Sequence, residues 1–272
     1  MDVTFWGVRG SLPCSSPNHI RYGGNTSCVS VQCGSTHVVF DAGTGIRQYG
    51  QWLALQNVDR VTLLLSHTHW DHINGFPFFS PAYDSRFKMS IYAGHLKGQQ
   101  LSVKSVLESQ MSAPTFPIPL DKMSAAMNFI DFYAGEPISV GSQVEILTVK
   151  INHPNGATGY RLNFGGKSVC YVTDTEHSPG VLCDSILKLI HRTDLVIYDC
   201  TYTDEEFPAR VSWGHSTWQE GVRLCQAAEA RSLAIFHHDP DHDDEFMDQV
   251  SYAAAHLWPG ACVAKEGMTI CL

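Results

Sequence analysis

The sequence lacks the features of a secreted or membrane-spanning protein. No apolar run approaches the roughly 18 residues that cross a bilayer, and residues 1–6 have neither the basic nor the apolar part of a signal peptide. The nine cysteines are odd in number and include no Cys-x-x-Cys pair, which excludes a disulfide framework and a thiolate zinc knuckle. We therefore expect a cytoplasmic protein with reduced cysteines and no membrane partner.

Positive charge is also scarce. The chain has 18 lysines and arginines against 27 acidic residues, a formal net charge of −9. Such a surface repels long polyanions, which makes a long nucleic acid an unfavourable substrate. A small phosphate ester remains compatible, because bound cations can reverse the field inside a site.

The 272 residues contain no repeat, low-complexity segment or linker, so we expect a single domain over residues 1–272. The pattern of apolar runs and turns predicts strands at residues 3–8, 27–33, 37–40, 61–65, 89–92, 144–151, 159–164, 168–173, 195–200, 233–236 and 261–264. It predicts helices at residues 45–55, 96–110, 181–190, 216–230 and 244–256. Three prolines make residues 112–119 an irregular excursion. Strands in both halves with helices between them favour an α/β (α+β) fold, a four-layer αββα sandwich.

The densest chemical signal follows the apolar run of residues 61–65. The segment Ser66-His67-Thr68-His69-Trp70-Asp71-His72 places three imidazoles and a carboxylate where a buried strand ends. Imidazole nitrogens and carboxylate oxygens are the groups that bind zinc and its neighbours. One ion cannot easily use all four from so short a loop, so the spacing predicts two adjacent metal ions.

A dinuclear site needs further ligands, and three more residues of the right type stand at ends of predicted strands. His153 follows the strand at 144–151, Asp174 closes the strand at 168–173, and His237 closes the strand at 233–236. The sites of α/β enzymes collect at such strand ends. A lone histidine there is usually structural, but three positions beside a four-ligand loop favour metal binding.

These seven residues resemble the pattern of the metallo-β-lactamase superfamily, H-x-H-x-D-H followed by His, Asp and His. The segment Phe40-Asp41-Ala42-Gly43-Thr44-Gly45 matches the upstream D-A-G loop of that family, which supports the metal loop. The resemblance implies the αββα sandwich and assigns His67, His69 and His153 to one ion and Asp71, His72 and His237 to the other. Asp174 would bridge both ions. Histidine with carboxylate suits zinc, the expected metal, and also manganese and iron.

Asp174 also separates the branches of that family. True zinc β-lactamases have a cysteine in its place, whereas Cys170 here lies four residues earlier, within the predicted strand. The aspartate type resembles the phosphodiesterase branch and the thioester hydrolases. Antibiotic hydrolysis is therefore not expected.

A second motif, Trp213-Gly214-His215-Ser216-Thr217, resembles the G-H-S-T loop of the tRNA 3′-end processing endonucleases and related phosphodiesterases. In that family the histidine lies by the scissile phosphate and works with an acidic residue, usually glutamate, whose place Asp199 takes here. A departing alkoxide needs a proton, and an imidazolium oriented by a carboxylate can supply it. The alternative interpretation makes Ser216 the N-cap of the following helix and His215 a bystander.

The sequence thus predicts a metal-dependent phosphodiesterase that uses a hydroxide activated by two metal ions, with His215, Asp199 and Asp71 acting in catalysis. The glycine- and lysine-rich arm of the tRNA-processing enzymes is absent, so we expect a small substrate such as a cyclic nucleotide or a short diester. A thioester or lactone hydrolase is the alternative among enzymes, and a metal- or nucleotide-binding sensor is the alternative outside them. A homo-oligomer is compatible with this interpretation. Asn25, in a glycine turn, could contact substrate or stabilise the turn.

Overall fold

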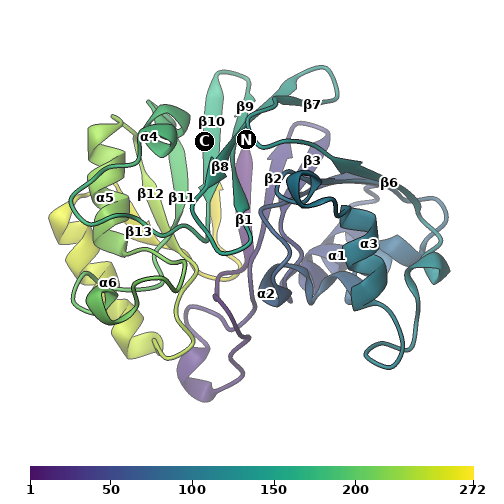
Figure 1. The fold of residues 1–272 in the computed structure, drawn as a ribbon, viewed down its shortest axis with the longest axis horizontal. Coiled ribbons are helices and arrows are strands. Elements are labelled where there is room, and N and C mark those ends of the chain that lie inside the picture. The colour runs from purple at the N-terminus through teal and green to yellow at the C-terminus, as the bar shows by residue number, and fades with distance from the viewer.

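The computed structural model describes residues 1–272 as two seven-stranded sheets packed face to face (Figure 1). The first sheet has the order β14-β1-β2-β3-β4-β5-β6. Its strands are β1 (Asp2–Gly7), β2 (Cys28–Cys33), β3 (Thr36–Phe40), β4 (Arg60–Leu65), β5 (Lys88–Ala93), β6 (Ala126–Asp131) and β14 (Thr269–Cys271). The second sheet has the order β13-β12-β11-β10-β9-β8-β7. Its strands are β7 (Ile138–Val140), β8 (Val144–Ile151), β9 (Ala157–Phe164), β10 (Lys167–Val172), β11 (Leu195–Asp199), β12 (Leu233–Phe236) and β13 (Ala261–Val263).

Helices cover the outer face of each sheet, and three apolar layers hold the four layers together. Helices α1 (Ile46–Leu55) and α3 (Val103–Gln110) pack on the first sheet, while α4 (Asp184–Ile190), α5 (Trp218–Ala227) and α6 (Asp244–Leu257) pack on the second (Figure 1). The central layer lies between the sheets, where Phe40 stacks on Tyr171 with ring centroids 4.8 Å apart. The αββα prediction is confirmed. No helix combines the length and the apolar character that a membrane crossing requires.

The strand directions create one edge at which functional side chains can gather. In the first sheet β3, β4, β5 and β6 run parallel to one another, and in the second β10, β11, β12 and β13 do so. The loops after β4, β10, β11 and β12 all leave from carboxyl ends of parallel strands, where ligands bind in α/β sheets. This is where the predicted site residues occur.

The element predictions fail mainly at caps and at the edges of the sheets. The helix predicted at residues 96–110 is broken: a 3₁₀ turn ends at Gln100, which has a left-handed φ of 58°, and α3 begins only after Ser102, whose side chain caps it. The edge strands β6, β7 and β14 were not predicted, because they are short and mix polar with apolar residues. Their pairing depends on the neighbouring strand more than on their own pattern.

Candidate metal centre

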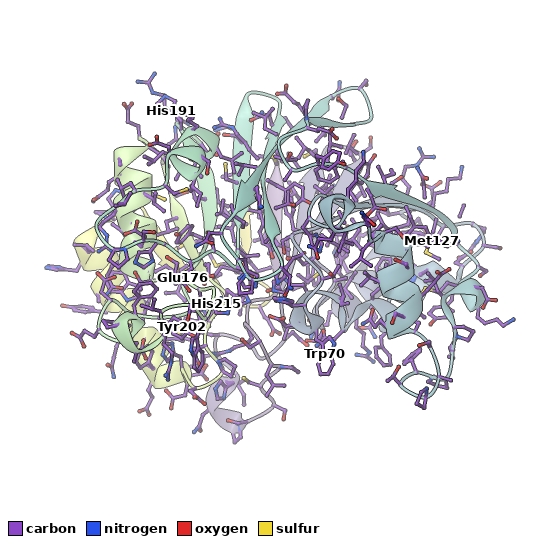
Figure 2. The ribbon with its side chains drawn as sticks, in the orientation of Figure 1. Trp70, Met127, Glu176, His191, Tyr202 and His215 are labelled. Carbon is purple, nitrogen blue, oxygen red and sulfur yellow. The ribbon has the colours of Figure 1, made fainter.

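The first group of candidate ligands lies in the loop after β4. This strand is buried from Val61 to Leu65, and the chain then turns into α2 (Trp70–Ile73), a single helical turn. Asp71 and His72 are buried on this turn. Trp70, which precedes Asp71, is 84% exposed (Figure 2). The alternation directs the ligand-type side chains inward and the tryptophan outward.

The second sheet supplies His153 after β8, Asp174 after β10 and His237 after β12. Asp174 and His237 have left-handed φ angles of 55° and 62°, conformations that residues other than glycine rarely adopt. Such backbone strain is concentrated at functional sites, where surrounding structure holds a side chain in place. The strand ends therefore present both side chains to the first sheet at a cost in local strain.

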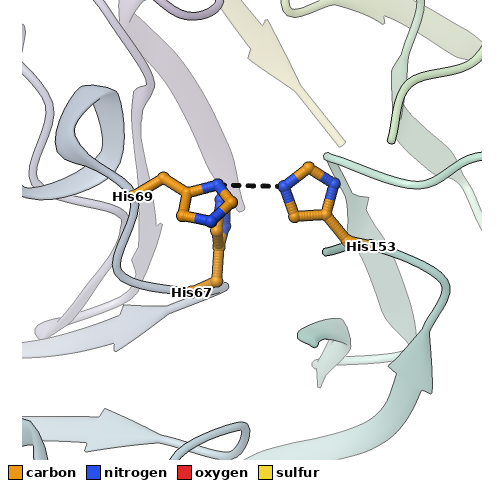
Figure 3. A group of neighbouring side chains, drawn as sticks. All are labelled: His67, His69 and His153. Atoms are coloured by element: carbon orange, nitrogen blue, oxygen red, sulfur yellow. Dashed lines mark hydrogen bonds between the residues drawn. The ribbon is translucent and has the colours of Figure 1, made fainter. Parts of the chain in front are cut away.

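His67, His69 and His153 form the first cluster, with one ring nitrogen from each lying within 4.8 Å of the others (Figure 3). Nδ1 of His69 lies 3.0 Å from Nε2 of His153, although the two residues come from different sheets. Asp71, His72, Asp174 and His237 form the second cluster, in which Nε2 of His72 is 3.2 Å from Oδ2 of Asp71. These are the two groups that the resemblance implied.

Asp174 stands between the two clusters. Its Oδ1 is 3.8 Å from Nε2 of His67 and 3.8 Å from Nε2 of His153. Its Oδ2 is 3.1 Å from Nε2 of His72 and 3.3 Å from Nε2 of His237. Each oxygen of this one carboxylate thus faces a different histidine group.

Hydrogen bonds at the opposite ring nitrogens fix the orientation of three histidines. Nδ1 of His72 donates to Asp41 (2.8 Å), and Nδ1 of His153 donates to the Gly214 carbonyl (2.8 Å). Nδ1 of His237 is 2.9 Å from the Thr201 hydroxyl. This is the arrangement of metal-binding histidines, in which the outer nitrogen is held and the inner one faces the other ligands.

The donor set itself fits divalent metal ions. Nε2 of His67 and Nε2 of His72 are buried and have no hydrogen-bond partner, which is costly unless another group occupies the cluster. Burial, followed by the charge of His72, lowers the pKa of His67 well below its ordinary value. Burial alone would raise the pKa of Asp174, but His237, His72 and His67 outweigh it and hold the pKa well below its usual range. The neutral His67 and the ionised Asp174 are in the state that binds metal. For His72, burial is outweighed by the charges of Asp174, Asp71 and Asp41, which raise the pKa well above its ordinary value, so a metal ion that binds there displaces a proton.

Asp41 supports the metal loop, as the D-A-G segment predicted. Its Oδ1 accepts the Ser66 backbone N–H (2.7 Å), and its Oδ2 accepts hydrogen bonds from the Ser66 hydroxyl, His72 and the Tyr171 hydroxyl, each at 2.8 Å. The residue is fully buried and has a left-handed φ of 58°. A single carboxylate from the first sheet therefore connects the loop after β4 to β10 of the second sheet.

The structure also brings His215 and Asp199 together. Nδ1 of His215 lies 3.1 Å from Oδ2 of Asp199 and 3.8 Å from Oδ1 of Asp174. Burial would lower the pKa of His215, but the charge and hydrogen bond of Asp199, helped by Asp174 and Asp71, raise it to about 9. The remaining bonds of Asp199 come from Thr201 and from the backbone N–H of Thr175, so the buried carboxylate is held on all sides.

Two alternatives left by the sequence are decided by contacts. The N-cap of α5 is Thr217, whose hydroxyl accepts the Glu220 N–H, so the interpretation of Ser216 as the cap is wrong. The Ser216 hydroxyl instead contacts His177 (2.8 Å) and Tyr198 (3.1 Å). The Asn25 amide donates to Glu266 at 3.0 Å, which is the turn-stabilising role.

Residues that the sequence did not single out complete the surroundings of the clusters. Oε2 of Glu176 accepts the Gly214 N–H at 2.8 Å, and the Ser11 N–H donates to Oδ2 of Asp71 at 2.7 Å. The position of Glu176 two residues after Asp174 was a usable signal. Ser11 lies in the turn after β1, and its role could not be predicted from the sequence. It contacts Asp71 through its backbone N–H, a group that every residue except proline has.

Comparison with known proteins places the chain in a family. Residues 36–238 match the model of the β-lactamase superfamily domain, and the chain belongs to this family. A protein named Ribonuclease Z from Haloarcula marismortui is 22% identical over an alignment that covers 98% of this chain and 96% of that protein. The metallo-β-lactamase fold protein YhfI from Bacillus subtilis superposes with a TM-score of 0.74 at 21% identity, covering 99% of this chain and 98% of that one. A diphosphatase of the PhnP family superposes with a TM-score of 0.69 at 17% identity, covering 100% of this chain and 97% of that one.

Family and clusters together identify a metal-dependent, phosphodiesterase-like hydrolase. The predicted fold and enzyme class are confirmed. The expectation that a long nucleic acid is unfavourable finds no support, because the relative from Haloarcula marismortui is named as a ribonuclease.

Proposed function

We propose that the protein is a phosphodiesterase that works with two divalent metal ions, zinc being the first expectation and manganese or iron also fitting the ligands. His67, His69 and His153 would hold one ion, Asp71, His72 and His237 the other, and Asp174 both. The observation that carries the proposal is the Asp174 carboxylate, whose two oxygens face the two histidine groups separately. Bound ions of this kind polarise phosphoryl oxygens and lower the pKa of water.

His215 supplies the proton that the departing oxygen needs. Asp199 holds Nδ1 of the ring at 3.1 Å, which leaves Nε2 as the atom that donates to the leaving oxygen. The charge and hydrogen bond of Asp199 raise the pKa of His215, which favours the protonated imidazole that this role needs. Asp71 acts in the same site through the second cluster, where the Ser11 N–H and His237 fix its Oδ2.

The substrate that we propose is a small phosphodiester such as a cyclic nucleotide or a short diester. The net charge of −9 and the likeness in fold to a PhnP-family diphosphatase support it. RNA is the second candidate, and the relative named Ribonuclease Z favours it. The test measures the rates at which one metal-loaded preparation hydrolyses a cyclic nucleotide, a dinucleotide and an RNA with a 3′ extension. The substrate that is hydrolysed fastest distinguishes the two candidates.

The role of His215 is tested by leaving groups that differ in their need for a proton. His215→Ala should lower kcat by roughly 10²–10⁴-fold on a dinucleotide, whose alkoxide must be protonated, and much less on bis(p-nitrophenyl) phosphate. Metal content by elemental analysis should stay at the wild-type level. An equal loss on both substrates would contradict the general-acid role.

The metal assignment has a separate test. Asp174→Ala should lose bound metal and hydrolysis together, because neither histidine group then keeps its shared carboxylate. Asp121→Ala, which changes an exposed aspartate outside the clusters, is the matched control. Full metal content and activity in Asp174→Ala would contradict the proposal that Asp174 binds both metal ions.

A further inference from the structure

An arginine contacts two aromatic rings, one of which packs against His215. In the loop between β11 and α5 the guanidinium carbon of Arg210 lies 4.8 Å from the centroid of the Trp213 ring and 5.9 Å from that of Tyr202. The Tyr202 ring in turn meets the His215 ring edge to face at 6.0 Å (Figure 2). We call Tyr202, Arg210 and Trp213 the aromatic–arginine cluster.

The charge of Arg210 is not neutralised within the protein. Its guanidinium forms no ion pair and no hydrogen bond, whereas the neighbouring Arg223 pairs with both Asp204 and Glu220. Trp213 is 58% exposed, so its ring is open to solvent beside the guanidinium. A free guanidinium on an exposed indole offers an anion site next to a stacking surface.

The loop that carries the cluster is firmly attached. The Tyr202 N–H donates to the Ser216 carbonyl, and the Trp218 N–H donates to the Tyr202 carbonyl, at 3.0 and 3.2 Å. Phe207 stacks on His177 at 4.1 Å. Because the cluster is anchored on both sides of His215, it presents a preformed surface rather than a mobile one.

The place of the cluster relates it to one part of the substrate. His215 protonates the oxygen that departs, so the leaving group must lie on the His215 side of the phosphorus. The Tyr202 ring packs against His215, and the guanidinium of Arg210 lies over the Tyr202 ring, so the cluster continues outward from His215. In the hydrolysis, the oxygen of water bonds to phosphorus and gives up a proton to solvent, the bond to the leaving oxygen breaks, and the His215 proton moves to that oxygen.

We propose that the aromatic–arginine cluster binds the leaving group and that this leaving group is a nucleotide, its base stacked on Trp213 and its own phosphate bound by Arg210. The inference rests on the proposed phosphodiesterase function and narrows its substrate class. Base stacking tolerates any base, while the guanidinium fork recognises phosphate in two contacts. A leaving group without a phosphate loses only the second contact.

The test compares three diesters on the metal-loaded enzyme: bis(p-nitrophenyl) phosphate, the dinucleotide ApA, and pApAp, in which either leaving nucleoside carries a phosphate. We expect kcat/KM for pApAp to exceed that for ApA by about tenfold or more. Arg210→Met should abolish this preference while leaving bis(p-nitrophenyl) phosphate within about twofold. Arg47→Met, which removes another exposed arginine without an ion pair, should change none of the three.

Variants at Trp213 test the stacking surface. Trp213→Ala should lower kcat/KM for both nucleotide substrates by about tenfold, and Trp213→Phe should restore most of the loss because a ring is kept. Competition with bis(p-nitrophenyl) phosphate gives a binding readout on the wild-type enzyme. Adenosine 3′,5′-bisphosphate should inhibit the wild type about tenfold more strongly than AMP, whereas the two nucleotides should inhibit Arg210→Met equally.

Three results would overturn the inference. In the first, Arg210→Met lowers kcat/KM equally on all three diesters. In the second, the two nucleotides inhibit the wild type equally. Either result would show that Arg210 only stabilises the loop and does not bind a phosphate of the substrate. Wild-type enzyme that hydrolyses bis(p-nitrophenyl) phosphate but neither nucleotide would overturn the inference and leave the proposed function standing. Failure to hydrolyse any diester would remove the proposed function, and the inference with it.

Discussion

Asp41 shows how much one buried residue contributes without belonging to either cluster. Its carboxylate accepts hydrogen bonds from the Ser66 backbone, the Ser66 hydroxyl, His72 and Tyr171. The oxygens of an ionised carboxylate can only accept hydrogen bonds, and all four of these groups donate to them. The Asp41 side chain has no contact with solvent. The orientation of His72 toward the second cluster therefore depends on this charge.

Asp41→Asn tests this dependence with the smallest possible change. The new amide group places two donors where donors already converge, so at least one buried hydrogen bond is lost. We expect the free energy of unfolding to fall by about 2–3 kcal/mol. The affinity for the metal held by His72 should fall by about 10–100-fold.

Chelator competition and thermal unfolding measure the two effects, with Asp121→Asn as an exposed control. Asparagine tolerates the left-handed backbone at this position, so a loss cannot be attributed to φ. Unchanged metal affinity in Asp41→Asn would show that His72 is oriented by its loop alone.

Among the elements, the turn before α5 connects the largest number of site residues to one another. Gly214 donates its N–H to Glu176, accepts a hydrogen bond from Nδ1 of His153 and precedes His215. Its φ is +89°, and a Cβ atom there would lie 2.6 Å from Nδ1 of His153. The turn therefore requires glycine for two reasons, its backbone conformation and the contact with His153.

Gly214→Ala should accordingly do more than strain the backbone. The left-handed conformation costs an alanine about 1–2 kcal/mol, and Gly180→Ala, with φ +74° and open space around it, is the matched control for this cost. Only Gly214→Ala should also displace His153 and lower metal affinity about tenfold or more. Thermal unfolding measures the cost of the strained backbone, and elemental analysis after dialysis measures the loss of metal. Equal metal content in Gly214→Ala and Gly180→Ala would show that His153 moves aside for the new methyl group without losing its metal.

At the scale of the whole molecule, the proposed ligands come from both sheets. His67, His69, Asp71 and His72 follow β4 of the first sheet, whereas His153, Asp174 and His237 follow strands of the second. The sheets are also joined by the central apolar layer, which includes Phe40 on Tyr171, and by the hydrogen bond from Tyr171 to Asp41. Metal ions would thus add a further connection at one edge of this layer.

Chelation should therefore destabilise the whole fold. Ligand that binds only the folded state at about 1,000 times its Kd contributes about 4 kcal/mol, so EDTA should lower Tm clearly. Restoring zinc should return Tm to its original value, and Asp174→Ala should respond to neither treatment. A wild-type Tm that EDTA leaves unchanged would mean that metal ions do not hold the two sheets together.

Sequence patterns predicted most of the fold because the inner strands are continuous apolar runs. Strand β8 was predicted with its observed bounds, and β12 as well. The predicted helix at 96–110 failed because Ser102 caps a new helix inside it, and the edge strands failed because their pairing is set by neighbours. Local pattern thus sufficed for a strand buried along its whole length, such as β12, and for one buried mainly at alternate positions, such as β8.

The sequence by itself determined which residue types could bind metal, since the ligands after β4 lie within six consecutive positions, 67–72, and those of the second sheet stand at strand ends. Only the tertiary structure decided how they meet. The two faces of the Asp174 carboxylate, the Asp199–His215 hydrogen bond and the position of Arg210 on Trp213 depend on strand order and on the packing of one sheet against the other. Those relations join side chains far apart along the chain, and no local pattern encodes the distance between them.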